Sequence, residues 1–505
     1  GSNSAVVPRG YARWVPLIDA KDADNRQRGA VGAIAFHYDG PYAGSAWGFF
    51  GVSNRDLFAP GDPEGERLLL NTVEALLRRA FLHGLRTDWA CYRQGEAVGA
   101  SVTVRNAGRR SLKLRVRFVM EGGPPLKEVE VGEVPPGQSR QVRATWPAFH
   151  FQSDLYRVSA TLLADTVPLD RMESGFVVWT PAVVLSGPRV DLKENFFRVN
   201  GRPAFLCGTN QTGMIFASSF ENPLVWDRDL AQMRDYGVNV MRVLHFSPFA
   251  KGAFPQGPWS PADLRQRPEA LVRQADALVQ LCQKHGIALF LSLHDWMEVG
   301  LSDAELELQR DWARFWAARY RDVPGILYDV QNEPTVHTPD TPDLRRAWNA
   351  FLKGRYGTDA VWRAAWGSVA PNAPLGEVPL SAPASEWSSL AARDYAEFRV
   401  EVLNRWVRAN VQGVREGDPD ALCTVGFLQT LANADKLLGV RYTDFSNMHS
   451  YLPPADLPKN LKYIDRRFEG KSFSLGEFGA KCHPAWQPSA FVGVTEAQAG
   501  DYFLR

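Results

Sequence analysis

The spacing of apolar residues changes along the chain and divides it into parts. From about residue 185, short and nearly continuous apolar runs alternate with longer segments whose apolar residues recur every three or four positions. The runs predict strands buried on both faces, and the longer segments predict amphipathic helices. Seven strand-like runs follow one another, at residues 204–210, 238–246, 287–296, 326–334, 422–428, 445–452 and 472–480. Seven such units in series favour an α/β fold of the (β/α)8 TIM-barrel type over an open sheet.

Residues 86–184 follow another pattern, because apolar and polar residues alternate one by one. The alternating segments are separated by the turn sequences Asn-Ala-Gly, Gly-Gly-Pro-Pro and Pro-Pro-Gly. Period-two alternation with regular turns predicts an antiparallel, Ig-like β-sandwich.

The first 85 residues contain one strand-like run and one amphipathic helix. The run lies at residues 29–40, and the helical spacing covers residues 65–84 and ends at Gly84. We interpret residues 1–85 as a short α/β segment, the remnant of a larger domain. The predicted organisation is therefore this segment, a β-sandwich over residues 86–184 and a catalytic barrel over residues 185–505.

Composition narrows the classes of function. A chain of 505 residues is long enough for two or three domains. Its net charge of +1 gives no overall electrostatic attraction to nucleic acid or to an anionic membrane. No apolar run approaches the length of a transmembrane helix. The 16 Trp and 28 Phe residues are numerous, and they predict either large cores or stacking platforms for sugar rings.

The five cysteines are scattered along the sequence and show no CxxC or Cys/His spacing. This distribution disfavours a disulfide scaffold and a structural zinc site and favours isolated reduced thiols. Unpaired cysteines slightly favour the cytoplasm, whereas a removed signal peptide would permit secretion, so the location stays open. The turn after the first strand, "GTNQTG", lacks the GxGxxG spacing of a nucleotide site. We therefore expect neither a metal nor an organic cofactor.

Polar residues end six of the seven predicted strands. In a (β/α)8 barrel the carboxyl ends of the strands converge on one pocket. Burying so many donors and acceptors would cost several kcal/mol unless they were paired or had a function. The residues are Asn210, Arg242, His294, Asn332 with Glu333, His449 with Tyr451, and Glu477.

Two carboxylates, Glu333 on the fourth strand and Glu477 on the seventh, would face each other across the barrel mouth. Glycoside cleavage needs one carboxylic acid to protonate the leaving oxygen and a second carboxylate to attack the anomeric carbon or activate water. Arg242 and Tyr451 could hold Glu477 ionised, and the charge of Glu477 should raise the pKa of Glu333. Asn332 could donate to the 2-hydroxyl of the sugar.

The Asn-Glu-Pro that ends the fourth strand and the Gly-Glu-Phe-Gly that ends the seventh resemble clan A of the retaining glycoside hydrolases, and family 5 most closely. The resemblance covers about residues 190–480 and includes the Arg, His, Asn-Glu, His-x-Tyr and Glu of the strand ends. It implies that Glu333 is the acid/base, that Glu477 is the nucleophile and that the other strand-end residues bind or support the substrate.

Two features depart from the family 5 pattern. The stretch at residues 351–367 resembles an insertion of family 42 β-galactosidases. The clan also implies an eighth strand that ends in a sugar-stacking Trp. Only one helical segment, residues 495–505, is evident after Glu477, so we expect the eighth strand to be missing from the chain.

The resulting hypothesis is a retaining β-glycoside hydrolase that cleaves β-linked oligo- or polysaccharides. The expected partner is a carbohydrate substrate, with no nucleic acid and no membrane. The alternative is a non-catalytic carbohydrate-binding or assembly module built on a truncated barrel, which the presence of both carboxylates disfavours. Candidate sugar platforms in the loops are Trp259, Trp296, Trp387 and Trp486, of which we select Trp296 and Trp486 as substrate-binding residues.

Overall fold

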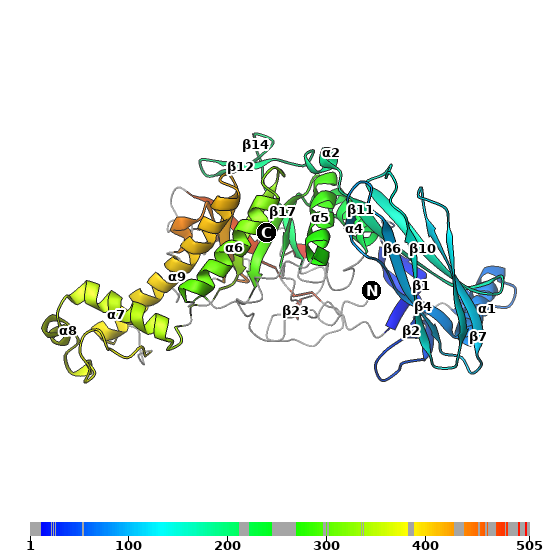
Figure 1. Cartoon of the computed structure of the whole chain (residues 1–505), viewed down its shortest axis with the longest axis horizontal. Coiled ribbons are helices and arrows are strands. Elements are labelled where there is room, and N and C mark those ends of the chain that lie inside the picture. The colour runs from blue at the N-terminus through cyan, green and yellow to red at the C-terminus, as the bar shows by residue number, and fades with distance from the viewer. Residues whose placement is uncertain are drawn as a thin grey trace.

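The computed structural model places a sheet-rich N-terminal half beside a curled parallel sheet, from which a helical extension projects (Figure 1). It describes residues 12–21, 23, 25, 27–52, 55–211, 222–244, 269–295, 299, 302–334, 336, 338–381, 388–428, 439–452, 455–459, 462, 471–479, 481–482, 493–494 and 500–501. No helix in these ranges has both the length and the apolar character needed to span a membrane.

The N-terminal segment is a three-stranded antiparallel sheet with one helix. Its strands are β1 (Ala12–Lys21), β2 (Gln27–His37) and β3 (Ala46–Phe50), and the short 3-10 helix η1 (Arg55–Phe58) leads to α1 (Pro63–Arg78). Asp62 caps α1 by accepting from the N–H of Glu64. The prediction that this helix extends to Gly84 is wrong, because Arg79 adopts a left-handed conformation and the chain continues as a strand.

Two sheets form the sandwich, and their apolar side chains share one core. One sheet has the order β4-β6-β9 and the other β5-β11-β10-β7-β8. The division of the chain at residues 85 and 184 stays a proposal. The strands are β4 (Ala80–Thr87), β5 (Cys91–Tyr92), β6 (Val98–Asn106), β7 (Leu112–Met120), β8 (Lys127–Val134), β9 (Ser139–Trp146), β10 (Leu155–Ala164) and β11 (Val167–Val178).

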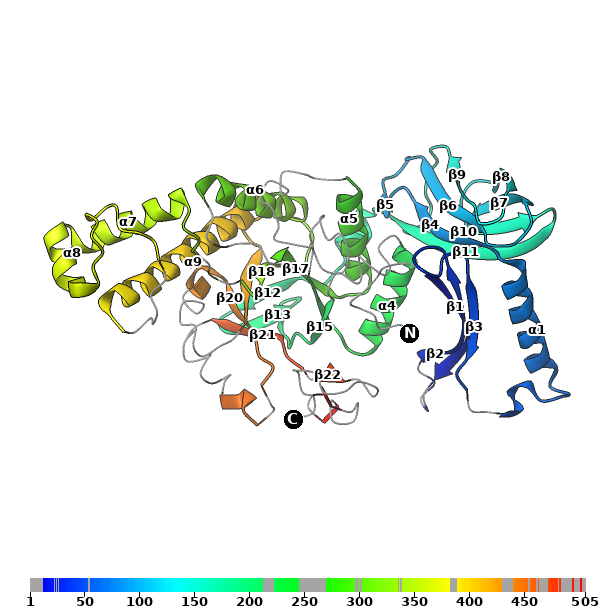
Figure 2. The same cartoon turned by 90° about the horizontal axis from the view of Figure 1, so that it is seen from below.

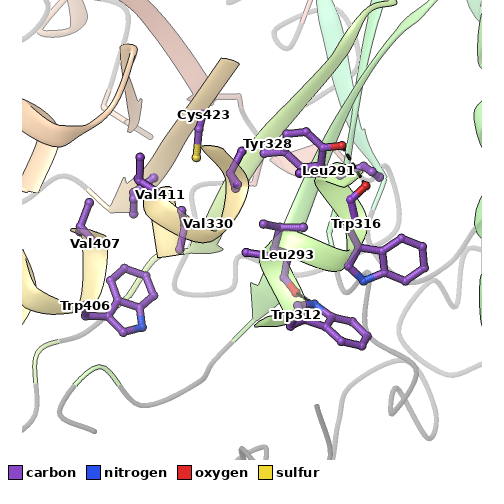
Figure 3. Packing of buried hydrophobic residues seen from close by; sticks show 14 of the residues in the cluster. Leu291, Leu293, Trp312, Trp316, Tyr328, Val330, Trp406, Val407, Val411 and Cys423 are labelled. Carbon is purple, nitrogen blue, oxygen red and sulfur yellow. Dashed lines mark hydrogen bonds between the residues drawn. The ribbon is translucent and has the colours of Figure 1, made fainter. Parts of the chain in front are cut away.

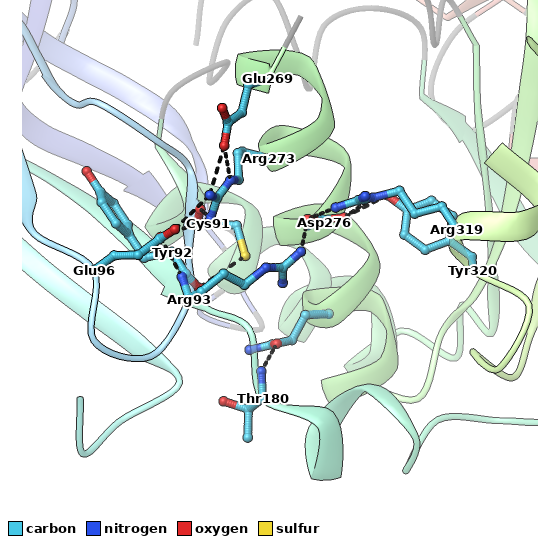
Figure 4. A network of polar contacts seen from close by, with 11 residues as sticks. Cys91, Tyr92, Arg93, Glu96, Thr180, Glu269, Arg273, Asp276, Arg319 and Tyr320 are labelled. Carbon is cyan, nitrogen blue, oxygen red and sulfur yellow. Dashed lines mark hydrogen bonds and ion pairs between the residues drawn. The ribbon is translucent and has the colours of Figure 1, made fainter. Parts of the chain in front are cut away.

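A buried carboxylate ties the sandwich to the C-terminal part (Figure 4). Asp276 of α5 (Glu269–Lys284) is nearly inaccessible and pairs with Arg93 of the sandwich and with Arg319 of α6 (Asp303–Arg319), each at 2.6 Å. The hydroxyl of Tyr320 donates a further hydrogen bond to Asp276 at 3.1 Å. Because a buried charge is costly without partners, these guanidinium groups hold the sandwich in a fixed place on α5.

The seven predicted strands form one sheet, in which neighbours in the chain are neighbours in space and every pair is parallel. The sheet curls as part of a barrel would, and its closure as a complete (β/α)8 barrel stays a prediction. The strands are β15 (Gly208–Gln211), β16 (Val240–Val243), β17 (Ala288–Asp295), β18 (Ile326–Asn332), β19 (Leu422–Leu428), β20 (Phe445–His449) and β21 (Ser472–Glu477).

Helices cover the outside of the parallel sheet. They are α4 (Pro223–Asp235), α5, α6 (Asp303–Arg319) and α9 (Leu390–Gly417), while α2 (Pro181–Val184) and the 3-10 helix η4 (Gly439–Tyr442) are short. Trp312, Trp316 and Trp406 fill the space between α6, α9 and the strands (Figure 3). Among the residues that the structure describes, seven tryptophans are fully buried, so cores account for much of the aromatic excess.

The C-terminal part also contains a small sheet, a helical extension and a pair of short strands. A small antiparallel sheet of β12 (Val190–Lys193), β13 (Phe196–Val199) and β14 (Arg202–Pro203) packs under the amino ends of the parallel strands, in a core that includes Phe290, Leu327 and Phe445. The stretch that resembles the family 42 insertion lies in the projecting extension, built from α7 (Pro342–Tyr356), α8 (Asp359–Trp366), the 3-10 helix η3 (Gly367–Val369) and the start of α9 (Figure 2). Strands β22 (Lys481–Cys482) and β23 (Gly493–Val494) pair with each other.

Candidate active site

A register shift in β18 brings the residues of the Asn-Glu pair into the interior of the curled sheet. In this strand Tyr328 and Val330 face the helices, so simple alternation would also turn Asn332 towards them. The shift between Asp329 and Asn332, relative to β19, reverses the alternation. As a result the side-chain oxygen of Asn332 accepts a hydrogen bond from Arg242 at 3.0 Å.

Glu333 follows the shift in a backbone conformation that is rare for a residue with a side chain. Its φ is 45°, in the left-handed region, and the next residue is Pro334. Such a conformation costs about 1–3 kcal/mol and persists where the surroundings enforce it. The N–H of Glu333 donates to the carbonyl of Gly426 at 2.7 Å, which fixes the turn and the direction of the carboxylate.

Arg242 is the centre of a buried network beneath the site. It donates to Glu477 Oε1 at 2.7 Å and makes two contacts with Asp329, one of them from Nε at 3.1 Å. Burial alone would lower the pKa of Arg242, but the carboxylates of Asp329 and Glu477 outweigh it and raise that pKa. Arg242 therefore remains a fixed positive charge that orients Glu477.

Glu477 and Glu333 face each other with His449 and Tyr451 around them. The hydroxyl of Tyr451 donates to Glu477 Oε2 at 2.5 Å, and His449 Nδ1 lies 2.9 Å from Glu333 Oε1 and 3.5 Å from Glu477 Oε1. One potential ligand atom from each of His449, Glu333 and Glu477 lies within 4.8 Å of the others. The carboxyl groups are therefore close enough to act on one bond.

The pKa values around the two carboxylates indicate which groups donate protons. Burial, and the hydrogen bond to Glu477, raise the pKa of Tyr451, so this residue stays a donor across the neutral range. Burial and the charge of Arg242 lower the pKa of His449 to about 4. A neutral His449 can accept from a protonated Glu333 or donate to an ionised one.

The same geometry defines which residues could hold a cation. Within the residues that the structure describes, His449, Glu333 and Glu477 form the one group of three possible ligands. Glu477 already accepts from Arg242 and Tyr451, and a guanidinium at 2.7 Å opposes a second positive charge there. The expectation that no metal is needed stays a prediction.

The other predicted residues fall in different places. Asn210 donates to the carbonyl of Gly476 at 2.9 Å, next to Glu477. His294 is fully buried, and its Nε2 lies 2.9 Å from Asn410 of α9, in the helical layer. The predicted sugar platforms lie outside the described residues, and they are Trp259, Trp296, Trp387 and Trp486.

Two contributors to the site were not predicted from the sequence. Asp329 pairs with Arg242 and accepts from the N–H of Gly426 at 2.8 Å. The available signal was a carboxylate in the middle of the apolar run 326–334. At Gly426 a Cβ would lie 2.7 Å from Arg242 Nη2 and 2.8 Å from His449 Nε2, so only glycine leaves room for both side chains.

We predict that Asp329→Asn destabilises the protein and lowers its activity. The change removes one of the two carboxylates that neutralise a fully buried guanidinium, at an expected cost of about 3 kcal/mol or more in the free energy of unfolding. Urea unfolding at neutral pH measures this cost. The matched control is Asp340→Asn, which breaks an exposed pair with Arg345 and should leave the urea midpoint unchanged. Equal midpoints for both variants would contradict the role of Asp329.

Stability should fall as the pH drops from about 6.5 to about 4. Burial lowers the pKa of both His294 and His449 from 6.5 to about 4. In this window the two histidines of the unfolded chain bind protons that those of the folded protein do not. Each histidine therefore lowers the free energy of unfolding by about 1.4 kcal/mol for every pH unit. Thermal melting of His294→Gln should show a shallower decline over this window than the unmodified chain. The variant His150→Gln, at an exposed position, should keep the full slope.

Comparisons with known proteins found a matching family model and similar solved structures. The family model described as cellulase (glycosyl hydrolase family 5) matches residues 200–453. Similar solved structures include a β-glucuronidase of Bacteroides uniformis (TM-score 0.36, 14% identity, covering 84% of this chain and 43% of that chain). A second is a putative β-galactosidase of Bacteroides fragilis (TM-score 0.37, 13% identity, covering 84% of this chain and 53% of that chain). A third is a GH2 β-galacturonidase of Eisenbergiella tayi (TM-score 0.34, 14% identity, covering 84% of this chain and 61% of that chain). The chain spans about half the length of these structures, and no curated protein matches it.

Proposed function

Because the chain belongs to glycosyl hydrolase family 5, whose model matches residues 200–453, we propose that it is a retaining β-glycoside hydrolase. The proposed substrates are β-linked oligo- or polysaccharides. The observation that carries the proposal is the close approach of the Glu333 and Glu477 carboxyl oxygens, which belong to a group of atoms all within 4.8 Å of one another. Retaining enzymes hold their two carboxyl groups about 5–5.5 Å apart, whereas inverting enzymes leave about 6.5–9.5 Å for a water molecule.

In the first step, an oxygen of Glu477 attacks the anomeric carbon while the glycosidic C–O bond breaks. Glu333 gives its proton to the departing oxygen, and a covalent glycosyl ester on Glu477 results. Arg242 and Tyr451 donate to the two oxygens of Glu477 and hold it in position for this attack. Their hydrogen bonds also stabilise the carboxylate when it is released.

In the second step, the ionised Glu333 takes a proton from water, and the water oxygen attacks the anomeric carbon. The bond to Glu477 breaks and its carboxylate is restored. The contact between His449 Nδ1 and Glu333 Oε1 supports both forms of Glu333, because a neutral imidazole accepts from the acid and donates to the base. Asn332 accepts from Arg242 through its oxygen, which leaves its amide nitrogen to donate to the sugar 2-hydroxyl.

The stereochemistry of the first product tests this proposal. We expect the unmodified chain to hydrolyse at least one member of a panel of aryl β-glycosides and soluble β-linked polysaccharides. Proton NMR of the early reaction should show the β-anomer first, followed by slow mutarotation. An α-anomer as the first product would indicate inversion and overturn the double displacement. Absence of hydrolysis across the panel would favour a non-catalytic binding module.

A further inference from the structure

The N-terminal sheet carries a layer of exposed aromatic rings that the active site does not use. We call it the aromatic face, formed by Trp14, Tyr42, Trp47 and Phe49, which are 54%, 56%, 49% and 45% exposed. The rings pack edge to face, with centroids 6.1 Å apart for Trp14 and Phe49 and 4.8 Å apart for Tyr42 and Trp47. Monomeric proteins seldom leave four large rings together in water without a binding function.

Strand pairing places Trp14, Trp47 and Phe49 on one side of the sheet, and Tyr42, in the turn between β2 and β3, joins them through its contact with Trp47. Trp14, Ala35 and Trp47 are directly opposite one another across β1, β2 and β3, so the backbones of the two tryptophans stand two strand spacings apart, about 10 Å. Phe49 lies two residues after Trp47 in β3, opposite Ala33, and so on the same side of the sheet. The small side chains of Ala33 and Ala35 leave room for rings of β1 and β3 to meet, as Trp14 and Phe49 do.

The opposite side of the sheet is covered. Ile34 and Phe36 point into a core with Phe81 of the sandwich and with Leu76 of α1, and Gly48 lies against Leu76 as well. Figures 1 and 2 both show α1 on the side of the N-terminal sheet that is remote from the parallel sheet. The aromatic face is therefore turned towards the part of the molecule that contains Glu333 and Glu477.

The chemistry of the face selects a neutral ligand. The paired positions Trp14 with Ala35 and Trp47, and Ala33 with Pro16 and Phe49, carry no charged side chain, and the His37 ring on the same side packs against Trp47 and Tyr42. An anionic polymer or a charged membrane surface would need cations here. A pyranose ring of a β-linked chain presents flat faces of C–H groups, which pack on aromatic rings while its hydroxyls stay in water.

We propose that the aromatic face binds a neutral β-linked polysaccharide and presents it to the catalytic part. The inference rests on the proposed function, since it assigns a second binding surface for the same substrate class. The backbone spacing of Trp14 and Trp47, about 10 Å, is comparable with the length of one disaccharide repeat, so one chain can reach both side chains. A second copy of this chain is the competing occupant, because an apolar face can also bury itself in a dimer.

Affinity electrophoresis tests the proposal without interference from hydrolysis. The Glu477→Gln protein is compared with the same protein that also carries Trp14→Ala and Trp47→Ala, in gels that contain soluble β-glucan, glucomannan, galactan or anionic polygalacturonate. The retardation constant for at least one polymer should weaken roughly tenfold or more, as when an aromatic anchor is truncated. The matched control is Phe196→Ala, which removes an exposed ring (61%) of β13, under the parallel strands, and should bind as before.

Folding and oligomeric state are measured on the same proteins. Melting temperature and elution volume establish that the double variant is folded. Equal retardation of the folded double variant and of Glu477→Gln overturns the inference, as does retardation by anionic polygalacturonate alone. Sedimentation that changes from dimer to monomer in the double variant, with retardation unchanged, assigns the face to self-association and also overturns it. Hydrolysis by the unmodified chain is measured separately. A negative result in the polysaccharide-binding experiment therefore does not contradict the proposed hydrolase activity.

Discussion

Glu477→Gln should lower turnover by roughly four orders of magnitude or more on every β-glycoside that the unmodified chain cleaves. The amide cannot attack the anomeric carbon, so no covalent intermediate forms even when the leaving group is very acidic. The substitution keeps the size of the side chain that contacts Arg242 and Tyr451. The loss should therefore appear in kcat. The melting temperature should also fall, because the change removes one of the two carboxylates that neutralise Arg242. Initial rates on an aryl glycoside and on a polysaccharide measure the loss of turnover.

A carboxylate away from the site provides the control for this experiment. Glu307→Gln changes an exposed residue of α6 that pairs with Arg310, and it should retain full activity. A Glu477→Gln protein that retained a tenth of the original turnover would exclude Glu477 as the nucleophile. Intact-mass measurement with a slow fluorinated glycoside should show one sugar bound to the unmodified chain and none bound to the variant.

Glu333→Ala should slow natural substrates by roughly two to four orders of magnitude, the usual contribution of general acid–base catalysis. The size of the effect should depend on the leaving group. A poor leaving group needs the proton of Glu333, whereas an acidic phenol departs without it. The variant should therefore form the glycosyl ester rapidly from a dinitrophenyl glycoside and then hydrolyse it slowly, giving a burst in phenol release.

Azide separates the two glutamates by the product that each variant makes. In Glu333→Ala, azide needs no general base, so it should restore the second step and give a β-glycosyl azide. An α-glycosyl azide from the same variant would reverse the assignment, because it would mean that Glu333 is the nucleophile. Product analysis by NMR distinguishes the two anomers, and the unmodified chain under the same conditions should give only the hydrolysed sugar.

The sequence by itself determined the order of the seven strands and the catalytic pair of the proposed mechanism. Strands buried on both faces must be apolar, so their positions are visible in the residues alone. Parallel strands in one sheet end at the same edge, so polar residues at their ends are brought together whatever the loops do. Glu333 and Glu477 could be named for this reason, although 144 residues separate them in the chain.

The tertiary structure alone decided features that depend on register and on distant contacts. The shift in β18 is measured against β19, so the sequence of β18 could not reveal that Asn332 and Asp329 both reach Arg242. The helix predicted to reach Gly84 ends at Arg78, because the following residues gain more by pairing with β6 than by continuing the helix. The aromatic face likewise exists only through cross-strand pairing, which places Trp14 and Trp47 on one side of a sheet whose other side is buried. Local propensity describes each segment separately. These features depend instead on strand pairing and side-chain packing between segments that meet only in the folded protein.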